Sequence, residues 1–309
     1  MPDKENSNEL IGIVILNYMS WELTVECVTN IRENIDGDLF FVLVDNASPN
    51  ESYTRLCELY SDDANVTCIL AEKNGGYAYG NNIGIRECQR KGIQYAVVTN
   101  NDVIFNKNSI KELVLTLKKN NNAVLTSPKI YDAWGNIGGY PFLGKPTLCQ
   151  FLGLSSMDSL RLDLSMDIEK KVYSVPCCCY AINVDRLLEM GALDEGTFLY
   201  LEEGTLAKRA FLKGYSIIFN PRATVIHNHV ENEKKTTVFY EKCLAESALY
   251  YWHTYESDRW LITLFIWNFF SMRLLIKVLM KKTESKNMGK VLKEYRNYCF
   301  KLLRGEKDE

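Results

Sequence analysis

The first hundred residues repeat one pattern, in which a short apolar segment is followed by a segment with helical periodicity. The apolar segments are rich in β-branched residues and cover 11–16, 39–44, 66–70 and 95–99. Helical spacing of apolar residues is found between them, at 21–35, 53–60 and 80–91. Strands that alternate with helices form parallel βαβ units with right-handed crossovers, and helices cover both faces of such a sheet. The sequence therefore predicts an α/β fold with a mostly parallel central sheet flanked by helices.

Polar residues follow each of these predicted strands. They are Asn17, Asp45 with Asn46, Lys73 with Asn74, and Asn101 with Asp102. The carboxyl ends of parallel strands meet at one edge of an open sheet, and ligands bind in the crevice that they form. The alternative is that Asn and Asp only cap the next helices or form turns. We expect the polar positions to converge on one ligand site.

Bulk composition limits the classes of protein to which the chain can belong. The 309 residues are 47% hydrophobic and 24% charged, which is ordinary for a globular protein with a large core. A net charge of −3 provides no basic field, so we expect no nucleic-acid partner. The ten cysteines have no CxxC spacing, which argues against a zinc site or a disulfide framework and favours a cytoplasmic location.

Three regions are expected along the chain. Residues 1–10 are polar and lack the apolar core of a signal peptide, so they are expected to form a flexible leader. Residues 11–255 hold the predicted α/β domain. Residues 256–309 are expected to form a C-terminal appendage of amphipathic helix.

The appendage contains an apolar run at 260–272 that is followed by basic residues. These are Arg273, Lys277, Lys281 and Lys282. The run is too short to span a bilayer, which needs about 20 apolar residues. An apolar face beside basic residues is typical of a helix that lies on a membrane surface, so we expect peripheral membrane contact through 260–282. The alternative is a helix that packs on the domain or on a second subunit in a homodimer.

Several short motifs occur in a fixed order between residues 11 and 230. They are VDNAS at 44–48, NGGYAYGNN at 74–82, TNNDV at 99–103, GALDE at 191–195, YLEE at 200–203, Arg209, GY at 214–215, and His227. Each motif alone is common turn chemistry. In this order they resemble family-two glycosyltransferases of the rhamnosyltransferase type.

The resemblance implies a fold and an activity. The fold is GT-A, a single nucleotide-binding α/β domain, which agrees with the strand and helix pattern. The activity is inverting transfer of a sugar from a nucleoside-diphosphate donor, dTDP-rhamnose or a UDP-hexose. The acceptor is a hydroxyl of a glycan or lipid-linked glycan in cell-surface polysaccharide synthesis.

The resemblance also implies where the donor binds. Asp45 would hydrogen-bond the pyrimidine base. Glycines in 74–82 would let the backbone approach the nucleotide, with Asn81 and Asn82 opening the next helix near the diphosphate. A glycine turn made only for packing is the alternative. The expected donor-binding residues are Asn17, Asp45, Asn46, Asn74, Gly75, Gly76, Asn81, Asn82, Asn101 and Asp102.

The metal ligands follow from the same resemblance. Residues 100–102 stand where many relatives have an Asp-x-Asp metal motif, and only the last acid is present. Mn²⁺ and Mg²⁺ take oxygen ligands and accept several from water and phosphate. Asp102 and His227 are therefore the expected protein ligands of Mn²⁺ or Mg²⁺. The alternative is that His227 and His229 are surface histidines.

Glu202 and Glu203 match the Glu-Asp pair of the family, whose second acid resembles the base that takes the acceptor proton. Glu203 is therefore the expected catalytic base, with Glu202 beside it, and Asp194 and Glu195 are expected to line the acceptor pocket. Glutamate is longer than aspartate, and Thr205 replaces an acid that is common in relatives. The rival hypothesis is a degenerate member of the fold that binds nucleotide sugar or a partner without turnover.

Overall fold

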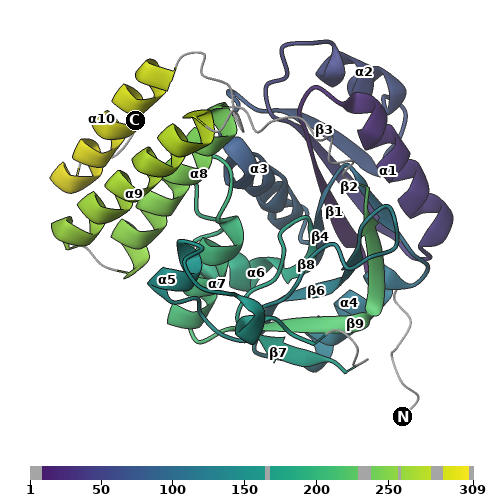
Figure 1. The fold of residues 1–309 in the computed structure, drawn as a ribbon. Helices are drawn as coiled ribbons and strands as arrows, with labels where there is room; N and C mark the ends of the chain where they lie inside the picture. Colours follow the sequence, from purple (N-terminus) through teal and green to yellow (C-terminus); the bar gives the residue numbers. More distant parts are fainter. Residues whose placement is uncertain (1–8, 164–167, 229–237, 257–258, 280–287, 306–309) are drawn as a thin grey trace.

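The computed structural model describes residues 9–163, 168–228, 238–256, 259–279 and 288–305. Within these residues one sheet crosses the molecule with helices on both faces, and a layer of C-terminal helices lies beside it (Figure 1). The strand order is β3-β2-β1-β4-β8-β6-β9-β5, and β7 pairs with β9 outside this path.

The first half of the sheet is parallel. Its strands are β1 (Ile11–Asn17), β2 (Leu39–Asp45), β3 (Val66–Leu70) and β4 (Tyr95–Asn100), and its helices are α1 (Trp21–Asn34), α2 (Ser52–Leu59) and α3 (Gly76–Arg90). β1 pairs in parallel with β2 and β4, and β2 pairs with β3. The register places the last residues of β1 and β2, Asn17 and Asp45, side by side. The predicted βαβ arrangement is confirmed.

The second half of the sheet is mixed. Its elements are β5 (Val103–Phe105), α4 (Ser109–Lys119), β6 (Ala123–Tyr131), α5 (Leu148–Phe151), η1 (Asp158–Leu160), β7 (Lys170–Val172), β8 (Cys179–Asn183), α6 (Val184–Glu189), α7 (Glu202–Leu212) and β9 (Ser216–His227). β8 is antiparallel to both β4 and β6 and so joins the two halves. The apolar runs at 216–219 and 223–226 are separated by Asn220, Pro221 and Arg222, a sequence that favours two short strands. They form one strand, β9, whose pairing with β6 shifts register after Pro128.

Both faces of the sheet are buried, which explains the nearly continuous apolar sequence of its strands. Val14, Val42 and Val98 belong to one core, which is covered by α3, α6 and α7. Their chain neighbours point to the other face and form a second core under α1, α2 and α4.

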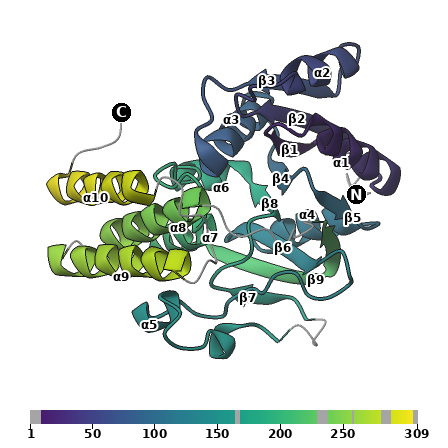
Figure 2. The same cartoon turned by 45° about the horizontal axis from the view of Figure 1, so that its top comes forward.

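The C-terminal layer consists of helices that have their own core. They are α8 (Val238–Tyr251), the π-helical turn η2 (Trp252–Glu256), α9 (Trp260–Leu279) and α10 (Met288–Arg304). Both views show α8, α9 and α10 side by side (Figures 1 and 2). Leu249, Ile266 and Tyr295 are buried between them, and Phe151 from α5 packs against this cluster.

α9 differs from the expected short apolar run. It is 20 residues long, and by length and composition its segment Trp260–Lys277 could cross a membrane, with a mean hydropathy of 1.3. About a fifth of that segment, 22%, is buried inside the protein. Lys281 and Lys282, which belong to the predicted basic flank, lie outside the described residues.

Candidate active site

Asn17 and Asp45 form a buried polar pair where β1 and β2 end. The side-chain amide of Asn17 donates to Asp45 Oδ2 at 2.7 Å, and the backbone N–H of Ser48 donates to Asp45 Oδ1 at 2.7 Å. The Thr24 hydroxyl donates to Asn17 Oδ1 at 2.9 Å. Each carboxylate oxygen can accept a second hydrogen bond, so Asp45 is held in one orientation while it keeps acceptor capacity.

Asn46 connects β2 with the start of α3. Its side-chain amide donates to Asn74 Oδ1 at 2.9 Å and to the Gly76 carbonyl at 3.1 Å. No hydrogen-bond partner is found among the described residues for Asn46 Oδ1, which is buried. A buried acceptor without a partner costs free energy, so this oxygen is a polar group that a ligand could satisfy.

α3 begins at Gly76, about one turn before the expected start at Gly80. Gly76 has φ +87°, and an added Cβ would lie 2.2 Å from the carbonyl oxygen of Phe198. The Tyr77 N–H donates to that same oxygen at 3.0 Å. The immediate reason for glycine at position 76 is therefore close packing against the loop 194–201. Gly75 is the N-cap residue before it.

Asn81 and Asn82 lie inside α3 and not at its N-terminus, where they were expected. Asn81 donates to the Tyr77 carbonyl at 3.0 Å. The Asn82 amide donates to the Leu193 carbonyl at 2.9 Å and to Glu195 Oε1 at 2.6 Å, and its oxygen accepts from the Leu193 N–H at 3.0 Å. Asn82 thus fixes the loop 194–201 to α3.

Asn101 and Asp102 form the turn between β4 and β5. Asn101 donates to Ser20 Oγ at 2.9 Å and to Thr24 Oγ1 at 3.0 Å, which links it to the Asn17–Asp45 pair. β5 pairs with β9 and brings His227, the last residue of β9, to Asp102. The distance between His227 Nε2 and Asp102 Oδ1 is 3.2 Å.

Asp102 and His227 form an ion pair, at a distance that two ligands of one divalent ion would also have. Two ligand atoms at right angles around one ion, each about 2.1 Å from it, lie about 3 Å apart. Burial lowers the pKa of His227, but hydrogen bonds to Asp102 and to the Cys178 thiol raise it to about 10. Within the described part of the chain, no group of three or more His, Cys, Asp or Glu side chains could hold an ion. The protein would supply two ligands, and His229 lies outside the described residues.

Glu202 and Glu203 lie in the first turn of α7, after two residues with left-handed backbone conformation. Tyr200 has φ +74° and Leu201 has φ +66°. Such conformations are costly for residues other than glycine, and they cluster at functional sites. Burial raises the pKa of Glu203, and burial together with the charge of Glu203 raises that of Glu202 to about 7. Two carboxylates with raised pKa values in one turn are suited to proton transfer.

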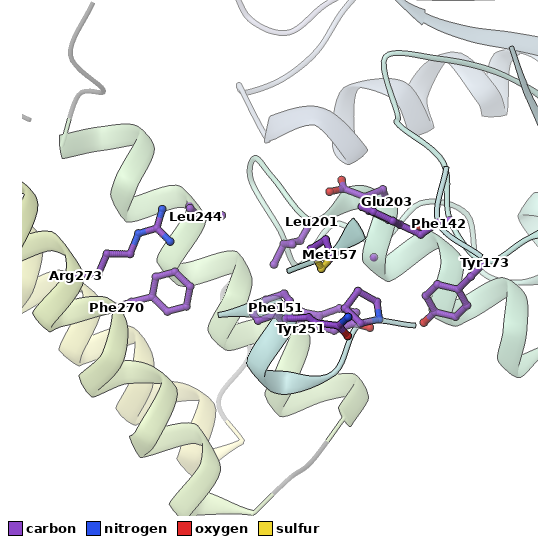
Figure 3. Close-up of a pocket in the computed structure, with 14 residues that line it drawn as sticks. Phe142, Phe151, Met157, Tyr173, Leu201, Glu203, Leu244, Tyr251, Phe270 and Arg273 are labelled. Carbon is purple, nitrogen blue, oxygen red and sulfur yellow. The ribbon is translucent and has the colours of Figure 1, made fainter. Parts of the chain in front are cut away.

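A cavity of about 260 Å³ lies beside Glu203. Its walls come from α7, from the segment 142–174, and from α8 and α9 (Figure 3). The lining residues include Phe142, Phe151, Tyr173, Leu201, Glu203, Tyr251, Phe270 and Arg273. Of these residues the sequence predicts only Glu203 as part of the site and Arg273 as part of a membrane-facing flank, because 131–171 has no regular periodicity and no sequence pattern connects α8 with the site. The aromatic residues of 140–173 were the one available signal.

Asp194 and Glu195 do not line this cavity. Asp194 Oδ1 accepts from the Tyr250 hydroxyl and the Gly196 N–H, both at 2.9 Å, and Asp194 Oδ2 accepts from the Tyr255 hydroxyl. Glu195 accepts from Asn82. In this structure the two acids hold the loop 194–201 to α3, α8 and η2, and their contact with an acceptor stays a prediction.

Comparison with known proteins gives matches along most of the chain. The model of the family described as Glycosyl transferase family 2 matches residues 12–178. The "Low-salt glycan biosynthesis hexosyltransferase Agl10" of Haloferax volcanii is 30% identical over 240 residues, which cover 75% of this chain and 71% of that protein. "Glycosyltransferase GlyG" of Streptococcus pneumoniae serotype 4 is 31% identical over 107 residues, 34% of either chain.

A solved structure shares the fold. The structure of GalNAc-T7 with UDP, GalNAc and Mn²⁺ has a TM-score of 0.59 and 15% identity, and the match covers 95% of this chain and 55% of that chain. The likeness confirms the GT-A fold expected from the sequence. The family match, which covers more than half of the 309 residues, and the hexosyltransferase relative together establish the class. The chain belongs to glycosyl transferase family 2 and is a glycosyltransferase.

Proposed function

We propose that the chain moves a sugar from a nucleoside-diphosphate donor, dTDP-rhamnose or a UDP-hexose, to a hydroxyl of a glycan or lipid-linked glycan in cell-surface glycan synthesis. The observation that carries this proposal is the position of Glu203. Its carboxylate lies in the first turn of a helix and borders a cavity in the same domain as the polar strand ends. The proposed place of action is the cytoplasmic side of a membrane.

The donor would lie along the carboxyl ends of β1, β2 and β4. Asp45 is fixed by Asn17 and Ser48 and keeps capacity to accept from a ring N–H of the base. The unpartnered oxygen of Asn46 and the residues Asn74, Gly75 and Gly76 stand next to it. Asn101 donates hydrogen bonds to Ser20 and Thr24 and so stabilises the turn that contains Asp102.

Asp102 and His227 would hold Mn²⁺ or Mg²⁺, with the remaining ligands coming from donor diphosphate and water. Such an ion neutralises negative charge on the leaving diphosphate. The proximity of the two side chains supports this assignment, and His227, whose pKa is raised by Asp102, would release its proton when the ion binds. The solved structure of GalNAc-T7, which has the same fold, contains Mn²⁺.

Glu203 would act as the base. It takes the proton of the acceptor hydroxyl while the oxygen forms a bond to the anomeric carbon and the bond from that carbon to the diphosphate oxygen breaks. Attack from the face opposite the leaving group inverts the anomeric centre. A base whose pKa is raised by burial holds the proton better than an ordinary carboxylate does.

A degenerate protein that binds donor without turnover is the second candidate. Its support is that Asp102 is the one acid in 100–102 and that Thr205 replaces an acid common in relatives. In the structure Thr205 is buried, and its hydroxyl donates to the Glu202 carbonyl at 3.1 Å. Thr205 therefore bonds back to the backbone of the first turn of α7 and does not stand as a free acid or base.

Donor binding and turnover separate the two candidates. We expect a UDP- or dTDP-sugar to raise the melting temperature in the presence of Mn²⁺, because a ligand that binds the native state stabilises it. Asp102→Asn is expected to remove most of the Mn²⁺-dependent part of this shift. The exposed Asp62→Asn serves as the matched control. Donor binding without transfer to any acceptor would favour the degenerate protein, and no shift with any donor would contradict both.

A further inference from the structure

The cavity beside Glu203 combines aromatic rings with hydrogen-bonding side chains. The hydrogen-bonding side chains are those of Gln150, Tyr173, Ser174, Glu203, Tyr251 and Arg273. The rings of Phe142, Phe151 and Phe270 lie among them. An aromatic ring can cover the apolar face of a sugar, while hydroxyl, amide and charged groups replace the water that the sugar hydroxyls lose. The walls therefore suit a sugar ring.

The cavity is small and preformed. Its volume of about 260 Å³ is just below the range of about 300–1,000 Å³ that is usual for drug-sized ligands. The rings of Phe151 and Tyr251 stack with centroids 5.9 Å apart, and the Tyr251 hydroxyl donates to Glu256 at 2.9 Å. Glu256 also pairs with Lys145 and with Lys208, the latter at 3.4 Å. These contacts hold the walls in place, so the cavity takes a ligand of the size of a single sugar.

Arg273 adds positive charge to one wall of the cavity. It comes from α9, whereas Glu203 comes from α7 (Figure 3). The Nε atom of Arg273 is 3.8 Å from Oε2 of the buried Glu241, and Lys277 hydrogen-bonds the other oxygen of Glu241. Two cations thus share one carboxylate, which gives this group of three a net charge of +1 at neutral pH. Such a group attracts an anion to the guanidinium.

The size of this charge distinguishes between two kinds of anion. A carboxylate carries one negative charge and would balance the group. A phosphate monoester carries about −1.5 to −2 at pH 7, and its excess charge would lie in a cavity that already contains the carboxylate of Glu203. A carboxylate is therefore the better match, and the planar guanidinium can bind both of its oxygens.

We infer that the cavity beside Glu203 binds an acidic sugar of the acceptor, a uronic acid, with its ring against the aromatic side chains and its carboxylate at Arg273. This inference rests on the proposed function and adds the chemical class of sugar that the acceptor presents. It makes Arg273 a residue that determines acceptor specificity, since a neutral hexose offers the guanidinium no anion.

Ligand-observed NMR titrations on the full chain can test it. The probes are methyl glycosides in matched pairs of gluco, galacto and manno configuration, each a uronate and the neutral hexoside that has a hydroxymethyl group in place of the carboxylate. Saturating UDP or dTDP and Mn²⁺ keep the donor site filled. We expect at least one uronate to bind about fivefold or more tightly than its hexoside, because the carboxylate adds a charge-assisted contact. Inorganic phosphate at the same concentration should not displace that uronate.

Variants assign the preference to one side chain. We expect Arg273→Gln to reduce it to within about twofold, and Arg273→Lys to keep part of it, because lysine keeps the charge but not the planar fork. Met157→Trp fills the cavity and should weaken binding of both members of the pair. Lys293→Gln is the matched control and should keep the preference, because Lys293 is an exposed cation on α10 that does not line the cavity. Every variant should keep its affinity for the nucleotide.

The outcomes that contradict the inference differ from those that contradict the proposed function. Equal binding of uronates and hexosides would overturn the inference alone, as would binding of the nucleotide without binding of any uronate. Displacement of the uronate by phosphate would overturn it, since the site would then be one for phosphate. An equal loss in Lys293→Gln and Arg273→Gln would also overturn it, because that pattern indicates general surface attraction. Failure of every nucleotide to bind would overturn the proposed function instead.

Discussion

Glu202 and Glu203 are adjacent carboxylates in the first turn of α7, where the helix dipole favours negative charge but burial opposes it. Burial dominates, since both pKa values are raised. Glu202 Oε1 is buried without a hydrogen-bond partner among the described residues. Ionisation of both carboxylates therefore lowers the stability of the folded state.

This cost predicts the effect of Glu202→Gln on stability. The pKa of Glu202 rises from 4.5 to about 7 on folding, so the native state binds its proton more tightly than the unfolded state does. Wild-type stability therefore falls, relative to the variant, as pH rises from about 4.5 to 7. We expect Glu202→Gln to gain about 1–2 kcal/mol at pH 8 and nothing at pH 4, measured by urea unfolding. An equal gain at both pH values would contradict this account.

The loop 194–201 packs against the start of α3. It can approach the helix closely because Gly76 has no side chain. The loop is held from three sides, by Asn82 of α3, by Tyr250 of α8 and by Tyr255 of η2. It leads directly into Leu201 and the two glutamates of α7. The position of the proposed base therefore depends on packing between helices that are distant in sequence.

Gly76→Ala tests this contact. The added Cβ would lie 2.2 Å from the Phe198 carbonyl oxygen, so the loop must move. Gly92→Ala is the matched control, because Gly92 also has positive φ, +72°, but has nothing within 4 Å of an added Cβ. We expect Gly92→Ala to cost about 1 kcal/mol of unfolding free energy and Gly76→Ala about 2 kcal/mol or more. Equal losses would show that the loop does not press on Gly76.

The sequence predicts the elements that a local pattern determines, and it does not predict contacts between residues that are far apart in the chain. β1, β2 and β4 are predictable because both of their faces are buried, which leaves continuous apolar runs. Asp102 and His227 meet only because β5 pairs with β9. In the sequence, only the family resemblance indicates that these two residues belong to one site. The tyrosine partners of Asp194 are 56 and 61 residues away, and no local pattern indicates them.

At the scale of the whole molecule, the C-terminal helices close the cavity beside Glu203 and also present apolar surface. Ile266 and Phe270 of α9 face the helical core, whereas Leu261 and Ile276 are exposed. α10 adds exposed basic residues, among them Lys293. We propose that this layer contacts an anionic membrane, with a homodimer as the rival explanation.

Vesicle sedimentation distinguishes these explanations. We expect the chain to sediment with vesicles that contain phosphatidylglycerol, and we expect Leu261→Glu with Ile276→Glu to reduce the bound fraction several-fold, since it places charge on the apolar face. The control is Leu59→Glu, an exposed apolar residue of α2. A chain that ignores vesicles but sediments as a dimer in analytical ultracentrifugation, and becomes a monomer in the double variant, would favour the subunit interface.

The central claim is that Glu203 removes the acceptor proton, whereas other residues bind the donor. The rate of sugar transfer by the Glu203→Gln variant tests this claim most directly. Glutamine keeps the shape of the side chain but cannot act as a base. We expect the rate of sugar transfer to fall about 100-fold or more while donor affinity stays within twofold of wild type, as general-base catalysis contributes about 10²–10⁴. The exposed Glu58→Gln should leave both quantities unchanged. Transfer by Glu203→Gln within about threefold of wild type would contradict the account.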